Sequence, residues 1–148
     1  MSQGRKISIA HDQPSQNNST QPMIFSTNWT LSTYKTKYWS PAGGDTATLG
    51  SDGTIAQHAG ILIAVPGTLN NLRLDCDITV ATAAVIVNVY KNNVLSALTA
   101  QIIVGATTGN SAALQLAVAA GDYISFEMPP TTATGVTLGA ASMQFVPT

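Results

Sequence analysis

The chain has 148 residues, of which 45% are hydrophobic and only 9% are charged, and its net charge is −1. This length is enough for one compact domain and a tail. The charged fraction is far below the roughly 25% that is usual in soluble domains. The near-zero net charge argues against a domain-wide nucleic-acid surface, so no nucleic-acid partner is predicted. A neutral polar surface suits a protein that packs among neighbours.

The sequence also argues against membrane insertion, disulfide bonding and metal binding. No window approaches 18 continuous apolar residues, and Met1 is not followed by the apolar run of a signal peptide. Cys76 is the single cysteine, which excludes an internal disulfide, and its apolar neighbours predict a buried thiol. His11 and His58 lie far apart, without metal-ligand spacing. We therefore predict no membrane partner and no cofactor.

Charge is unevenly distributed between the two ends of the chain. Residues 1–40 contain four basic residues and one acidic residue, whereas residues 41–148 contain two basic and six acidic residues. Such asymmetry is a weak indicator of a tail that interacts with a partner. Chance is the alternative, because few charges are involved.

Residues 1–40 are predicted to be an N-terminal arm that ends in an aromatic anchoring segment. Residues 1–21 are polar, with two possible strand residues near the start, and would be disordered in isolation. Five of the nine aromatic residues lie between residues 23 and 40. This segment either clamps the arm onto the body or a partner, or forms an ordinary first strand of the body. The predicted partner-binding residues are Arg5, Lys6, Ile7, Ile9, Phe25, Trp29, Tyr34, Tyr38 and Trp39.

Residues 41–53 are rich in turn-forming residues and are predicted to be a loop. The glycines at positions 43 and 44 lack the spacing and the lysine of a phosphate-binding loop.

From residue 54 onward, the sequence alternates between strand and turn signals. Turn signals recur about every 8–12 residues, which is typical of an all-β sandwich or barrel. The predicted strands are residues 55–65, 69–80, 83–91, 94–104, 114–118, 124–128 and a last segment from 136 onward, with a turn at 105–110. Residues 112–120 could also be helical, but their alternation favours a strand.

The clearest local signal is the hairpin formed by residues 83–91 and 94–104. Val85, Val87 and Val89 alternate with other residues and so share one face of an extended segment. Asn92 and Asn93 follow, and asparagine tolerates the positive φ that tight hairpin turns require. We predict a two-residue turn here and a core position for the three valines.

No group of residues has the pattern of a catalytic site. Asp75 and Asp77 share one face of a predicted strand with Arg73. They could bind Ca²⁺ or act as acid and base, but one strand face supplies few of the oxygens that calcium needs, so a solvent-facing or intersubunit stripe is favoured. Lys35 and Lys37 among aromatic residues could stack on nucleic acid or sugar, although two lysines support this weakly. We predict that the protein is not an enzyme.

Several segments resemble a known group of proteins. Residues 66–72, 87–94, 97–99 and 116–126 resemble small β-sandwich domains in virion proteins of tailed bacteriophages, which are jelly-roll modules similar in shape to the tumour necrosis factor head. The resemblance covers roughly residues 54–148. It implies an antiparallel jelly-roll β-sandwich, a trimer, and a place among capsid decoration proteins, head fibres or tail-fibre tips.

The sequence therefore predicts a structural virion protein with an extended N-terminal arm. In this interpretation, residues 54–148 form the sandwich, and residues 1–40 bind the major capsid protein or another virion protein. The leading hypothesis is a capsid decoration protein that stabilises the shell. The alternative is a receptor- or glycan-binding tip of a fibre or tail, with a site in loops 41–53, 105–111 or 129–135.

Overall fold

The computed structural model describes residues 22–31, 36–42, 47–48, 60–77, 79–134 and 138–148. Within these residues the chain is all-β, as predicted, and contains no helix. The strands are β1 Met23–Trp29, β2 Lys37–Trp39, β3 Ala47–Thr48, β4 Ile61–Leu62, β5 Gly67–Cys76, β6 Val85–Lys91, β7 Val94–Ile102, β8 Thr108–Asn110, β9 Gln115–Val118, β10 Tyr123–Met128 and β11 Gly139–Pro147.

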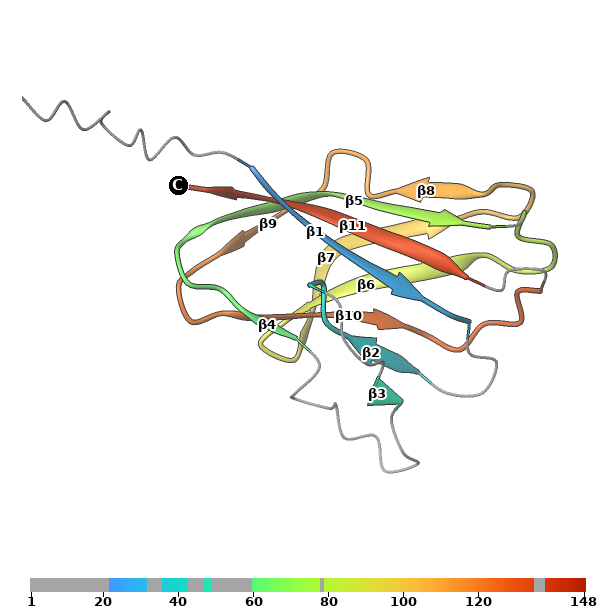
Figure 1. The fold of residues 1–148 in the computed structure, drawn as a ribbon, viewed down its shortest axis with the longest axis horizontal. Helices are drawn as coiled ribbons and strands as arrows, with labels where there is room; N and C mark the ends of the chain where they lie inside the picture. Colours follow the sequence, from blue (N-terminus) through green and yellow to red (C-terminus); the bar gives the residue numbers. More distant parts are fainter. Residues whose placement is uncertain (1–21, 32–35, 43–46, 49–59, 78, 135–137) are drawn as a thin grey trace, which may run out of the picture.

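The strands form one antiparallel sheet that curls until its two halves face each other (Figure 1). The hydrogen-bonded order is β1-β11-β5-β8-β7-β6-β10-β2-β3, while β9 pairs with β5 and β4 pairs with β10. We call β1-β11-β5-β8 the first half and β7-β6-β10-β2-β3 the second half. The short strand β8 connects the halves, because it pairs with both β5 and β7.

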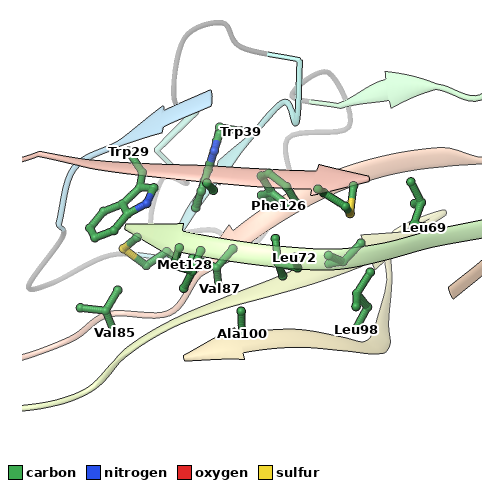
Figure 2. Packing of buried hydrophobic residues seen from close by; sticks show 14 of the residues in the cluster. Trp29, Trp39, Leu69, Leu72, Val85, Val87, Leu98, Ala100, Phe126 and Met128 are labelled. Carbon is green, nitrogen blue, oxygen red and sulfur yellow. The ribbon is translucent and has the colours of Figure 1, made fainter. Parts of the chain in front are cut away.

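The hydrophobic core lies between the two halves (Figure 2). Val85, Val87 and Val89 are fully buried, which confirms the prediction for this strand. Along most of β5 and β11, buried residues alternate with more exposed ones, and the buried residues form the side of the core that faces these valines. Cys76 is also buried as predicted, and its thiol donates to the carbonyl oxygen of Thr107 at 3.2 Å.

The predicted hairpin is present, with β6 and β7 joined by a two-residue turn. Lys91 pairs with Val94, and the intervening Asn92 and Asn93 have φ angles of 53° and 65°. Positive φ at both central residues is what the favoured type I′ hairpin turn requires, and asparagine adopts it at low cost. The local sequence therefore determines this turn.

Two segments differ from the sequence prediction. β8 lies inside the predicted turn at residues 105–110, and β3 lies inside the predicted loop at 41–53. Gly109 explains β8, because a Cβ there would lie 2.0 Å from the carbonyl oxygen of Gln101. The glycine thus permits close strand contact rather than a turn. Within the predicted segment 1–40, β1 and β2 pair with β11 and β10 of the body, while residues 1–21 of the predicted arm lie outside the described residues.

The end of the hairpin is fixed by polar contacts around Asp122. Its carboxylate accepts hydrogen bonds from the backbone N–H of Ala119 at 2.8 Å and from Asn92 Nδ2 at 2.7 Å, and it lies 3.1 Å from Lys91 Nζ. These contacts lower the pKa of Asp122 to about 2, with the backbone hydrogen bond as the largest cause. The group therefore remains an anion in mild acid.

The pH dependence of folding tests the role of Asp122. Because its folded pKa of about 2 lies below the ordinary 3.8, its stabilising effect is complete above about pH 4 and is lost as the pH falls towards 2. Urea unfolding should show wild type more stable than Asp122→Asn at neutral pH, with the difference shrinking between pH 4 and pH 2. A difference that stays constant over this range would contradict the prediction.

Candidate functional site

The predicted anchoring residues divide into those that the structure places and those that it does not describe. Arg5, Lys6, Ile7, Ile9 and Tyr34 lie outside the described residues, as do His11 and His58. The remaining four are Phe25 and Trp29 on β1 and Tyr38 and Trp39 on β2. Their positions show what the aromatic segment does within this chain.

The rings of Trp29 and Trp39 belong to the chain's own core (Figure 2). Trp29 is 1% exposed, and its indole packs so closely over Gly139 that a Cβ there would lie 2.0 Å from the ring. Trp39 is fully buried and packs edge-on against Phe126, with ring centroids 5.6 Å apart. These contacts pack both indole rings against the body of the chain, as either an ordinary first strand or a segment that clamps onto the body would do.

Phe25 and Tyr38 also contact side chains of the body. Phe25 is half-buried, and its ring centroid lies 6.3 Å from that of Phe145. Tyr38 is 5% exposed and packs edge-on against Tyr90 at 5.6 Å. The four placed aromatic residues therefore attach β1 and β2 to the sandwich.

Lys37 closes the connection between β1 and β2. Its ammonium group donates to the carbonyl oxygens of Thr30 and Leu31 at 3.1 and 3.2 Å, and to the Thr30 hydroxyl at 2.7 Å. These three hydrogen bonds occupy the ammonium group of Lys37, which is the lysine of the aromatic segment that the structure describes. They place Lys37 in a local bridge rather than on a stacking surface for nucleic acid.

The surface that remains open in this region is the edge of β1. Within the described residues, β1 pairs with β11 along its whole length, and no other strand pairs with β1. Ile24 is 73% exposed and Met23 is 49% exposed on this edge strand. An uncovered edge presents unpaired backbone groups that can accept a strand from another chain.

A polar hollow lies on the outer face of the first half of the sheet. Two lines of outward-facing residues cross β1, β11, β5 and β8 here, and the pairing registers define them. One line is Ser26, Ser142, Arg73 and Asn110, and the other is Asn28, Ala140, Asp75 and Thr108. Small side chains on β1 and β11 leave a depression of about 700 Å³, and Arg73, Asp75 and Asn110 stand beside it.

The charged side chains of Arg73 and Asp75 beside the polar hollow form no ion pair within the described part of the chain. The ion pair found there joins Lys91 to Asp122. Arg73, Asp75 and Asp77 are exposed on the outward face of β5 and its extension. The predicted solvent-facing stripe is therefore present, and it includes a guanidinium group free to bind a ligand.

A second polar line crosses the outer face of the other half. Tyr38, Glu127, Asn88 and Thr99 are register partners across β2, β10, β6 and β7. Asn88 Nδ2 donates to Glu127 Oε2 at 2.6 Å, and Thr99 Oγ1 donates to Asn88 Oδ1 at 2.8 Å. Burial, and then the Glu127 charge, raise the pKa of Tyr38 well above its usual value. At 8% exposure, Glu127 belongs to a structural network rather than an accessible site.

Sequence reasoning missed both polar lines, because each depends on the pairing of distant strands. Arg73 and Asp75 were recognisable as neighbours on one strand face, but Asn110 and Ser26 reach them only through β8 and β11. Glu127 is the one charged residue in the strand Tyr123–Met128, and a charge in such a strand is the signal that could have indicated a buried polar partner.

The described residues form no group of three or more His, Cys, Asp or Glu side chains that could hold a metal ion. They also include no helix that is long and apolar enough to cross a membrane.

Comparison of the sequence with protein-family models and with curated proteins gives no match.

Substitution of Trp29 distinguishes a core role from an anchoring role. Trp29→Ala removes a large buried ring and should reduce the free energy of unfolding by about 3–5 kcal/mol. Ile24→Ala, on the exposed side of the same strand, should change it by no more than about 0.5 kcal/mol. Urea unfolding of both variants checks this. A Trp29→Ala protein as stable as wild type would contradict the core assignment.

Proposed function

We propose that the protein is a structural virion protein of a tailed bacteriophage, with a jelly-roll sandwich that assembles as a homotrimer. In this proposal it is a capsid decoration protein that binds the capsid surface through its N-terminal region and stabilises the shell. Its place would be the surface of the virion, with the major capsid protein as the main partner.

The open edge of β1 is the observation that carries this proposal. β1 begins at Met23, so a partner strand at its edge would contact the sheet close to the point where residues 1–21, which include Arg5 and Lys6, join it in sequence. Strand addition supplies backbone hydrogen bonds, and the exposed side chains of Met23 and Ile24 supply apolar contact. The basic charge of residues 1–40 favours an acidic surface on the partner.

Burial of Trp29 in the core would give this attachment mechanical strength. A capsid protein bound to the β1 edge would pull on a strand that is itself held by Trp29 in the core and by seven residue pairs with β11. Force on the N-terminal region would therefore be transmitted to the whole sandwich. A decoration protein needs such a connection in order to resist expansion of the shell.

The low charge of the chain fits a place in an ordered assembly. Only 9% of the residues are charged, so charge repulsion between neighbouring copies is weak. A three-fold contact could bury part of this neutral surface.

A second candidate function is a receptor- or glycan-binding tip, and the polar hollow is the observation that favours it. Thr108 and Asn110, which belong to the predicted loop 105–111, border this hollow. Exposed donors and acceptors around this depression, among them the side chains of Arg73 and Asp75, could bind a polar ligand through hydrogen bonds.

Removal of residues 1–21 tests the leading proposal. We expect the truncated protein to keep its circular dichroism spectrum and oligomeric state but to lose cosedimentation with capsids that lack the decoration protein. Ile24→Lys should weaken binding as well, because a charge would replace an apolar contact at the β1 edge.

Val94→Lys is the matched control for the edge variant. Val94 is 67% exposed, close to the 73% of Ile24, and lies at the hairpin on the other half of the sheet. We expect it to bind capsids as wild type does. Unchanged binding by the truncated protein would exclude anchoring by the N-terminal segment.

A further inference from the structure

The polar hollow has the shape of a binding surface because of the side chains that form its floor. Ser26, Ala140 and Ser142 are small and lie on adjacent strands β1 and β11. Their backbone groups between β1, β11 and β5 are already paired in the ladder. A ligand in the hollow must therefore be recognised by side chains rather than by strand addition.

Three positions beside the hollow, Asn71, Gly109 and Asn110, are held in place by the fold. Asn71 has a left-handed φ of 50° and donates from Nδ2 to Gln144 Oε1 at 2.6 Å. Asn110 Oδ1 accepts a hydrogen bond from the backbone N–H of Ala112 at 2.8 Å. Gly109 fixes β8 against β7, as described above. These fixed positions would need little ordering on binding, whereas the exposed side chains of Arg73 and Asp75 would lose conformational freedom.

The chemistry of the hollow favours an uncharged, hydroxyl-rich ligand. Arg73 supplies donors, Asp75 supplies acceptors, and the side chains of Asn110, Ser26 and Ser142 can do both. The two opposite charges cancel, so the hollow provides no net attraction for an anion such as nucleic acid. The lining of this hollow is mainly polar, and the one exposed large apolar side chain nearby, Leu138, borders the smaller hollow beside it.

The hollow continues into a smaller one along the same sheet face. A second depression of about 330 Å³ shares Asp75 and Ala140 with the first and extends towards Asn28 and Asp77. The combined surface follows the outward-facing residues of β1, β11 and β5. A chain-like ligand with several polar units fits this extended form better than a single small molecule.

We infer that the polar hollow binds a neutral oligosaccharide, with hydroxyl groups bridging Arg73 and Asp75. Adjacent hydroxyls of a sugar donate and accept at once, which matches a guanidinium and a carboxylate two residues apart on one strand face. This inference rests on the second candidate function, since it names the ligand of a receptor- or glycan-binding tip. It does not depend on capsid anchoring by residues 1–21.

Binding to a glycan array, followed by NMR titration of the full chain with the neutral oligosaccharides that bind, tests the inference. Amide shifts should concentrate on β1, β11, β5 and β8. Arg73→Ala and Asp75→Asn should each weaken binding about tenfold or more, the loss expected for one charge-assisted hydrogen bond. Ser26→Leu should weaken it too, because it fills the floor without changing a charge.

Leu95→Ala is the control and should bind as wild type, because Leu95 is exposed on the hairpin of the other half and lies outside the lining of both hollows. Spectra of the unliganded variants establish that each is folded. Neutral glycans that shift a different face, or that bind Arg73→Ala and Ser26→Leu normally, would overturn the inference. If only an anionic glycan or a protein receptor shifts the hollow, the neutral-sugar assignment falls while the receptor-binding function stands.

Discussion

The contact between Trp29 and Gly139 determines where the first strand of the sheet lies. The indole occupies the space that any side chain at position 139 would need, so β1 and the start of β11 fit together in one arrangement. This contact brings a segment near the N-terminus into the core next to the last strand. The open β1 edge, the small-residue floor of the polar hollow and the burial of the aromatic segment all depend on that placement.

Local chemistry made much of the fold predictable. The hairpin between β6 and β7 follows from alternating valines and from two asparagines at a position that needs positive φ. Regular turn signals likewise predicted β5, β9 and β10. In each case the information lies within a few residues of sequence, and the described strands keep the expected inward-facing side chains.

The features that were missed depend on pairing between distant segments. The residues around Trp29 and Trp39 carry no local signal that separates a buried edge strand from an anchoring arm. Their place in the sheet of the body comes from pairing with β11 and β10. β8 was interpreted as a turn because Gly109 is a turn-forming residue, although the glycine is there to allow close contact with β7. The polar hollow could not be predicted either, since Arg73 meets Ser142 and Asn110 only through the sheet register.

The position of β11 also has a consequence for the order in which the molecule can form. β1 has β11 as its sheet partner, and β11 lies between β1 and β5. Among the described strands, β1 therefore gains its sheet partner only when residues 139–147 are available. Until then β5 and β1 both expose the edge that β11 later covers. Pairing between segments this far apart in sequence is slow compared with the closing of a local hairpin, so the hairpin between β6 and β7 can form well before the first half of the sheet is complete.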